Sequence, residues 1–273
     1  MDKMQPISQA LYSLLFLGCM GAGFPLYVQG QNVDELPPDS IYNIGYARGS
    51  LKNISGSVEQ ITEKQMNREL ITNPLEAIQG RIFVIYTESE AEKAVAYLKD
   101  QRIVGVDTET RPSFKRGTTH KVALLQISTQ DTCFLFRLNR IGMPDSLQEF
   151  LMSNTLKIGL SLKDDFNSLR KREDVHPDRG NWIELQDYVG RFGIADRSLQ
   201  KIFANLFGQK ISKSQRLSNW EAEVLSEGQK LYAATDAWAC VEIYNCLTEL
   251  ERTGGYEITE EEPIETTVNT NGL

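Results

Sequence analysis

The sequence contains few of the residues that bind zinc or form disulfide bonds. Its 273 residues include four cysteines and two histidines, and no two cysteines form a Cys-x-x-Cys pair. A structural zinc site takes four closely spaced cysteine or histidine ligands, so the sequence argues against one. A disulfide framework is equally unsupported, and the middle of the chain resembles a protein of a reducing compartment. No internal repeat is found, which argues against a repeat architecture.

An excess of positive charge, which favours binding to nucleic acids, is also lacking. The formal net charge is −8, but it comes from the two ends of the chain. Residues 1–80 carry −3 and residues 253–273 carry −5, whereas residues 81–252 hold 24 basic and 24 acidic side chains. The neutral middle therefore does not exclude a nucleic-acid partner. With 41% hydrophobic and 24% charged residues, the composition is that of a globular protein with a substantial core.

Long apolar runs are scarce. Residues 10–28 form one, but glycines and a proline interrupt it, so it is marginal as a membrane span. Lys3 precedes the run, and the small residues Val28 and Gly30 lie where a signal peptidase would cut. We therefore predict that residues 1–30 are signal-peptide-like and that no stable membrane span remains after their removal.

Residues 31–80 are predicted to be a linker followed by a fragment of another protein type. Residues 31–56 contain several Gly, Ser and Pro, as linkers and irregular segments do. Residues 43–81 resemble the start of the plug domain of TonB-dependent outer-membrane receptors, with a near match to its closing Leu-Gln-Gly-Arg at residues 77–81. The rest of such a plug and its barrel do not follow, so we expect no transport function.

From residue 81 the hydrophobic pattern becomes regular. A meander of three strands followed by alternating helices and strands predicts an α/β fold, a mixed sheet flanked by helices. The strands are expected at 81–87, 103–109, 121–129, 132–138, 156–162 and 182–189. The helices are expected at 89–101, 145–153, 164–172 and beyond, up to residue 252. Residues 253–273 are acidic and poor in apolar side chains, so they are predicted to be a disordered tail.

Two carboxylates stand at the end of the buried strand 103–109. Because strand side chains alternate between faces, Asp107 and Glu109 point the same way, about 6–7 Å apart along the chain. Two like charges on one face repel each other unless a cation lies between them. Such a pair is often only a solvated strand edge, so its meaning depends on the rest of the chain.

The last predicted helix carries a carboxylate on its apolar side. One stripe of this helix, at three-to-four spacing, contains Tyr232, Asp236, Cys240, Ile243 and Leu247. The spacing predicts that Asp236 is buried, and a buried carboxylate without a partner costs several kcal/mol. No Lys or Arg lies on the stripe, so the partner is either a backbone group or a metal ion.

Asp164 and Asp165 stand at the junction between the strand 156–162 and the next helix. Aspartate is a favoured N-cap residue, so one of the two is expected to act only as a cap. The other is expected to point over the edge of the sheet at which Asp107 and Glu109 emerge.

These residues follow the order Asp-x-Glu, Asp, Tyr-x-x-x-Asp. The order resembles the DEDD superfamily of 3′–5′ exonucleases, in the tyrosine-bearing branch that includes ribonuclease D and Werner-type exonuclease domains. The matching residues are Asp107, Glu109, Asp165, Tyr232 and Asp236. Asp165 is preferred to Asp164 because Leu169 follows it at the family's spacing. Segments such as VALLQIS and IELQDYV also match in order, so the resemblance covers about residues 81–252 and implies a ribonuclease H-like fold.

The resemblance implies metal-dependent hydrolysis of nucleotides from the 3′ end of DNA or RNA. In a two-metal mechanism, divalent ions about 3.5–4 Å apart activate a water molecule and stabilise the leaving 3′ oxygen. Mg²⁺ or Mn²⁺ suits this role because both ions prefer carboxylate oxygens. The expected ligands of the two ions are Asp107, Glu109, Asp165 and Asp236. The family's tyrosine, here Tyr232, orients the attacking water.

Contacts to nucleic acid are expected beside the metal site. The residues expected to make them are Thr108, Arg111, Phe114, Lys213 and Arg216. The basic side chains would bind backbone phosphates without reading the base sequence. Phe114 would wedge beside the terminal base, whereas Trp220 is expected to pack in the core.

Two other functions remain open at this point. One is a catalytically inactive nucleic-acid-binding module of the same fold, although the complete carboxylate set argues against it. The other is an exported receptor-associated protein, which residues 1–30 and 43–81 favour. The free thiols favour the cytoplasm for a nuclease and the N-terminus favours export; we expect a cytoplasmic protein. The oligomeric state is not predicted.

Overall fold

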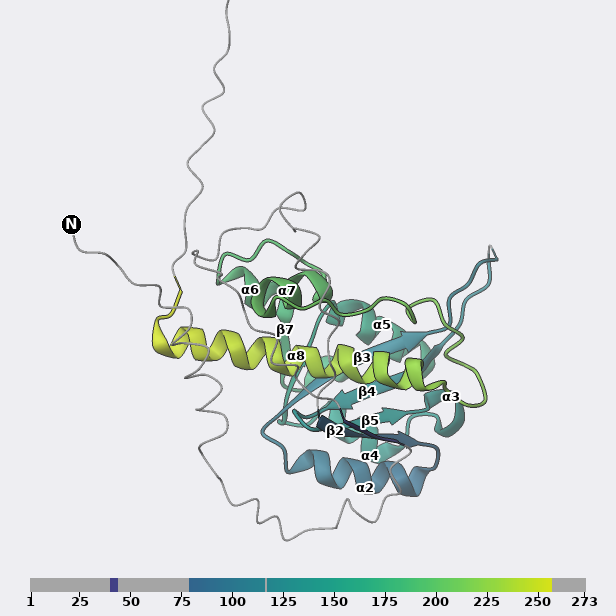
Figure 1. Cartoon of the computed structure of the whole chain (residues 1–273). Helices are drawn as coiled ribbons and strands as arrows, with labels where there is room; N and C mark the ends of the chain where they lie inside the picture. The colour runs from purple at the N-terminus through teal and green to yellow at the C-terminus, as the bar shows by residue number, and fades with distance from the viewer. Residues whose placement is uncertain (1–39, 44–78, 116, 257–273) are drawn as a thin grey trace, which may run out of the picture.

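The protein is built around one mixed sheet of seven strands (Figure 1). The structure is a computed structural model, and it describes residues 40–43, 79–115 and 117–256. Across the sheet the strands follow the order β1 (Ser40–Asn43), β2 (Gln79–Ile85), β5 (Thr132–Phe136), β4 (Val122–Ser128), β3 (Ile103–Thr110), β6 (Leu156–Gly159) and β7 (Trp182–Glu184). Strands β3, β4 and β5 form the predicted antiparallel meander. The prediction of an α/β fold with a mixed sheet is confirmed.

Three strands run in the same direction at one side of the sheet. β6 pairs in parallel with β3 and with β7, so their carboxyl ends meet at one edge. Asp107 and Glu109 lie near the end of β3, and Glu184 is the last residue of β7. Ligand and catalytic sites commonly lie at such an edge, because each strand delivers side chains there.

Helices cover both faces of the sheet. One face is covered by α2 (Glu88–Lys99), α3 (Leu138–Ile141), α4 (Asp145–Leu151) and α5 (Leu162–Arg172), whose apolar residues share a core with alternate strand residues. The opposite face is covered by α6 (Leu185–Gly190), α7 (Leu199–Phe207) and the long α8 (Glu227–Thr253), which crosses the sheet (Figure 1). A short 3₁₀ helix spans Pro177–Arg179. In α2 the predicted apolar stripe is buried: Ala91, Ala94, Val95 and Leu98.

Three local predictions are wrong. The strand predicted at 182–189 ends at Glu184, because this side chain accepts a hydrogen bond from the Gln186 N–H and starts α6. The strand predicted at 156–162 ends at Gly159, and α5 begins at Leu162. The third error lies in the predicted linker, where Ser40–Asn43 forms a strand that pairs with the backbone of β2 along what would otherwise be an open edge.

Several predictions for the two ends of the chain concern residues that the structure does not describe. The signal-peptide-like residues 1–30, most of the linker and plug-like fragment, and the acidic tail from residue 257 lie outside the described residues. Within the described ranges, none of the helices has both the length and the apolar character to cross a membrane.

Candidate active site

Helix α8 brings a buried carboxylate to the sheet. Its N-terminus is fixed by a capping box between Ser226 and Gln229, and its C-terminus by Gly254 in the left-handed conformation. The stripe predicted from the spacing is buried along its whole length, from Tyr232 to Leu247. Asp236 is only 4% exposed, so its carboxylate must find a partner within the protein or in a bound ion.

A glycine in β3 allows α8 to approach the sheet closely. A Cβ atom at Gly105 would lie 1.9 Å from the carbonyl oxygen of Ala237, the residue that follows Asp236. Gly105, Asp107 and Glu109 share one face of the strand, because side chains alternate. The close contact therefore places Asp236 against the two carboxylates of β3. A glycine inside an apolar strand is the sequence signal that could have predicted such an approach.

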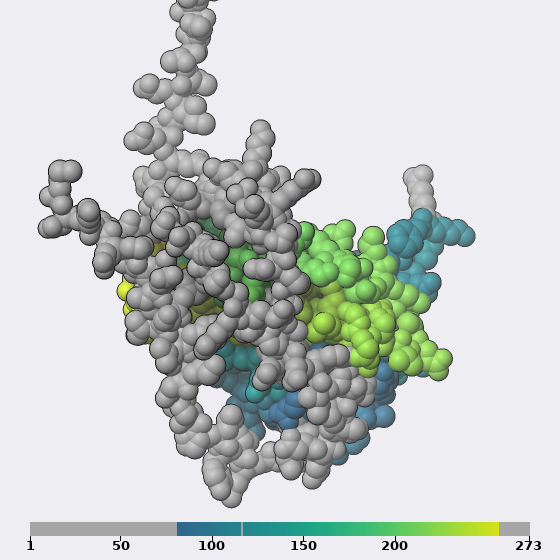
Figure 2. Space-filling view, in the orientation of Figure 1, coloured from purple at the N-terminus to yellow at the C-terminus, as the bar shows by residue number. Residues whose placement is uncertain are grey.

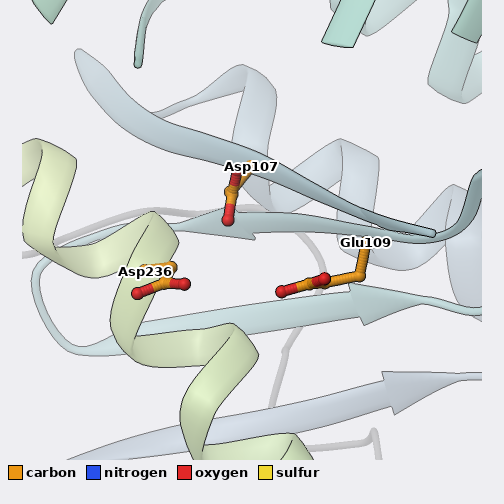
Figure 3. Close-up of side chains that lie close together, drawn as sticks. All are labelled: Asp107, Glu109 and Asp236. Carbon is orange, nitrogen blue, oxygen red and sulfur yellow. The ribbon is translucent and has the colours of Figure 1, made fainter. Parts of the chain in front are cut away.

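Three carboxylates converge beneath α8. Asp107, Glu109 and Asp236 each offer an oxygen atom within 4.8 Å of the other two, and Figure 3 shows the three side chains pointing toward one another. The pairing of β3 with β4 shifts register directly after Glu109. Irregularities of this kind re-aim side chains at the rims of sheets and often lie next to active sites.

The charges of these groups are unfavourable without a cation. The pKa of Glu109 is raised to about 10. Burial is the largest cause, and the negative charges of neighbouring carboxylates, first of all Asp107, add to it. Burial also raises the pKa of Asp107 to about 7, and burial followed by the charge of Asp107 raises the pKa of Asp236 well above its usual value. The Oδ1 atom of Asp236 is buried without a hydrogen-bond partner. Converging carboxylate oxygens, one of them buried without a partner, fit a hard divalent cation.

Asp165 approaches this group from the other face of the sheet. Its Oδ1 accepts a short hydrogen bond from the Thr108 hydroxyl, and Thr108 alternates with Asp107 and Glu109 along β3. Burial and then the charge of Asp107 raise the pKa of Asp165. The structure thus brings three of the four expected ligands together. The fourth, Asp165, lies beside them and is bound to the Thr108 hydroxyl. Asp164 is exposed, and neither aspartate is the N-cap, which is Ser161.

Tyr232 lies one helical turn before Asp236. It is 7% exposed, and its ring lies 6.1 Å from the ring of Trp220, which is fully buried as expected. Burial, the charges of Asp236 and Glu109, and a hydrogen bond with Asp236 raise the pKa of the Tyr232 phenol. The phenol therefore stays protonated at neutral pH, so it can donate a hydrogen bond but cannot act as a base.

The expected basic contacts lie on two segments beside the carboxylates. Lys213 and Arg216 are exposed on the α7–α8 segment (residues 208–226). Their positive charges partly oppose the rise in the pKa of Asp236 and of Glu109, respectively, so both cations act on the acidic site. Thr108 lies in β3 itself, whereas Arg111 and Phe114 lie on the β3–β4 loop (residues 111–121), which leaves β3 directly after the site.

The β3–β4 loop is tied to the α7–α8 segment. Glu221 accepts from Arg111 at 3.2 Å and pairs with His120 at 3.2 Å. Phe114, in the same loop, is 84% exposed. Figure 2 shows this loop and the α7–α8 segment on the same side of the molecule. Exposed cations and an exposed aromatic ring beside an acidic site suit a nucleic-acid strand.

Two known proteins similar to this chain have 3′-5′ exonuclease in their names. The mouse protein "Bifunctional 3′-5′ exonuclease/ATP-dependent helicase WRN" is 31% identical over 188 residues, which cover 65% of this chain and 13% of that protein. An Arabidopsis thaliana protein named "3′-5′ exonuclease" is also 31% identical over 188 residues, covering 63% of this chain and 65% of that protein. The chain thus spans less than two thirds of the length of both relatives.

Solved structures show the same fold. The Nibbler EXO domain of Aedes aegypti has a TM-score of 0.57 and 20% identity, covering 64% of this chain and 91% of that structure. RNase D of Escherichia coli has a TM-score of 0.56 and 20% identity, covering 63% of this chain and 45% of that structure. The expected ribonuclease H-like exonuclease fold is confirmed.

A family profile covers the region that holds the acidic site. Residues 82–250 match the profile of a family described as 3′-5′ exonuclease, which is more than half of the chain. The match includes β3, with Asp107 and Glu109, and the part of α8 that carries Tyr232 and Asp236. This chain therefore belongs to the 3′-5′ exonuclease family.

Proposed function

We propose that this protein hydrolyses nucleotides one at a time from the 3′ end of DNA or RNA in a metal-dependent reaction. The observation that carries the proposal is the convergence of Asp107, Glu109 and Asp236, with one buried oxygen of Asp236 unpaired. Without a bound cation, a cluster of buried carboxylates would only destabilise the fold. The family membership adds the reaction class.

The four acidic residues would hold two ions, which we propose are Mg²⁺ or Mn²⁺. Asp107, Glu109 and Asp236 already face one another, and Asp165 lies beside them on the Thr108 hydroxyl. Bound divalent ions would lower the pKa of the attacking water and offset charge on the phosphate. The carboxylates supply oxygen ligands only, which favours these hard ions over zinc.

Tyr232 is proposed to position the attacking water through its phenolic O–H. We expect Tyr232→Phe to lower kcat about 100-fold, because a misplaced nucleophile loses the advantage of orientation. Metal-dependent stabilisation should be retained, because the phenol is not a ligand. Single-turnover assays would measure the first effect and thermal unfolding with Mn²⁺ the second.

The matched control for this substitution is Tyr244→Phe. Tyr244 lies on the same helix, but its ring packs 5.1 Å from that of Tyr188, away from the acidic site. Equal losses of rate in the two variants would contradict a specific role for Tyr232.

Nucleic acid is proposed to bind across the β3–β4 loop and the α7–α8 segment. The contacts would come from Thr108, Arg111, Phe114, Lys213 and Arg216. Thr108 lies between the two carboxylates of β3, and its hydroxyl is bound to Asp165. Arg111 is half exposed in its ion pair with Glu221, and Phe114 is free to stack on a base.

We expect the double substitution of Lys213 and Arg216 by alanine to raise KM for single-stranded oligonucleotides. The slope of log KM against log salt should fall by about 1.4, because each lost phosphate contact on a single strand accounts for about 0.7. The control is Lys93→Ala, an exposed lysine on α2, across the sheet from α8. An unchanged salt slope in the double variant would place the strand elsewhere.

The experiment that tests the proposed function is a gel assay of the whole chain. The substrates are 5′-labelled single-stranded and recessed DNA and RNA, with Mg²⁺, Mn²⁺ or EDTA. We expect a ladder that shortens from the 3′ end and disappears in EDTA. Asp164→Asn, an exposed carboxylate on the same helix as Asp165, should cut normally. Binding of the oligonucleotides without cleavage would show an inactive binding module instead.

A further inference from the structure

Glu184 holds together three parts of the chain at the carboxyl edge of the sheet. Its Oε1 accepts hydrogen bonds from the backbone N–H groups of Ser161 at 2.9 Å and Gln186 at 3.0 Å. Its Oε2 accepts from the N–H of Leu162 at 2.7 Å. One carboxylate therefore joins the end of β7 to the turn between β6 and α5. Both oxygens are occupied by backbone donors, so Glu184 is a support rather than a metal ligand.

The turn that Glu184 holds is strained. Ser161 has φ 65° and ψ 36°, and within the described ranges it is the one residue other than glycine with a positive φ. This left-handed conformation is unfavourable for a residue with a Cβ atom. The Ser161 side chain makes no capping bond of its own, and the Gln186 amide donates to its hydroxyl at 3.1 Å. Residues of β7 and α6 therefore maintain the strained turn from outside.

The turn sets the position of Asp165. Ser161 precedes Asp165 by four residues, about one turn of helix, so the conformation at Ser161 decides which way the start of α5 faces. In the observed orientation Asp165 meets the Thr108 hydroxyl and acts electrostatically on Asp107 and Glu109. A different turn would rotate or shift Asp165 away from the acidic site.

We propose that Glu184 is a positioning residue for the metal site, acting through the strained turn at Ser161 to hold Asp165 beside Asp107. The inference rests on the proposed function, because it assigns Asp165 to the same metal site. It adds a residue from a strand end that carries none of the expected ligands. Strain that is maintained by surrounding bonds is common at functional sites, where it fixes the geometry in advance.

The test is a calorimetric titration of the metal-free whole chain with Mn²⁺. Glu184→Gln should weaken Mn²⁺ binding about 10-fold to 100-fold, as loss of a residue that orients a ligand does, with a similar fall in cleavage rate. The control for the loss of one negative charge is Asp187→Asn. Asp187 is an exposed carboxylate in the first turn of α6, so the Asp187→Asn protein should bind Mn²⁺ normally. Thermal unfolding shows whether each variant is folded.

The decisive variant adds Ser161→Gly to Glu184→Gln. Glycine adopts the left-handed conformation without strain, so it should restore much of the Mn²⁺ affinity if Glu184 acts through the turn. It cannot restore a lost charge. Wild-type affinity in Glu184→Gln, or no recovery in the double variant, would overturn the inference. If Glu184→Gln does not fold, Glu184→Asp takes its place, since it keeps the charge but withdraws the oxygens from the turn, and unchanged affinity there would equally overturn it.

The titration contains no nucleic acid, which separates the two proposals. Wild-type protein that binds Mn²⁺ but cuts no oligonucleotide would refute the proposed nuclease and leave the role of Glu184 to be decided by the affinities. If the wild-type protein cleaves oligonucleotides and Glu184→Gln binds Mn²⁺ with unchanged affinity, only the proposed role of Glu184 is refuted.

Discussion

Asp236→Asn is expected to abolish metal-dependent cleavage and, at the same time, to stabilise the metal-free protein. Removing one ligand from the converging group costs several kcal/mol of transition-state stabilisation, which corresponds to a rate loss of about a thousandfold or more. The opposite effect on stability arises because Asp236 is buried, has an unpaired oxygen and lies among other carboxylates. Asparagine keeps the shape of the side chain and removes its charge.

Removing this buried negative charge from among the other carboxylates should raise the stability by about 1–3 kcal/mol, within the usual range for a single substitution. For a domain of this size the unfolding midpoint would rise by about 2–4 °C for each kcal/mol. Cleavage assays and thermal unfolding in EDTA, both at pH 8, would measure the two effects. Asp164→Asn is the matched control, with neither effect expected. A destabilised and fully active Asp236→Asn protein would show that Asp236 is a structural residue with a protein partner.

Metal binding is expected to reverse a pH-dependent weakness of the fold. Burial raises the pKa of Asp107 from 3.8 to about 7 in the folded protein. Between these values the folded state binds a proton at Asp107 that the unfolded state lacks. The contribution of Asp107 to the free energy of unfolding is therefore fully present below about pH 4 and is lost as the pH rises through about 7. The raised pKa of Glu109, to about 10, continues the same trend at higher pH. The metal-free protein should therefore unfold more easily at pH 8 than at pH 5.

Mn²⁺ should restore the lost stability, mainly at the higher pH. At a concentration 100 times its Kd it would add about 2.7 kcal/mol, or about 5–10 °C in the unfolding midpoint. At pH 5 protons compete for the same oxygens, so the increase should be smaller. Calorimetric scans at both pH values, with EDTA or Mn²⁺, would measure this. An equal increase at both pH values, or one that persists in Asp236→Asn, would place the ion elsewhere.

Much of the fold and part of the site follow from the sequence alone. The alternation of side chains in β3 was enough to place Asp107 and Glu109 on one face, and the spacing in α8 was enough to bury Tyr232 and Asp236. Both inferences depend on local geometry, which repeats with a fixed period in a strand or a helix. The same two periods predicted which segments are strands and which are helices, and their order along the chain predicted the mixed sheet.

The tertiary structure decided how these residues meet. The contact at Gly105 determines how near α8 comes to β3, and the Thr108 hydroxyl is the group that Asp165 meets there. The left-handed turn at Ser161 depends on Glu184, which is 23 residues away in the sequence. A hydrogen bond between distant residues leaves no periodic trace in a single sequence. The sequence therefore determined which carboxylates this protein brings to one edge of its sheet, and only the packing of the elements decided their distances, partners and charges.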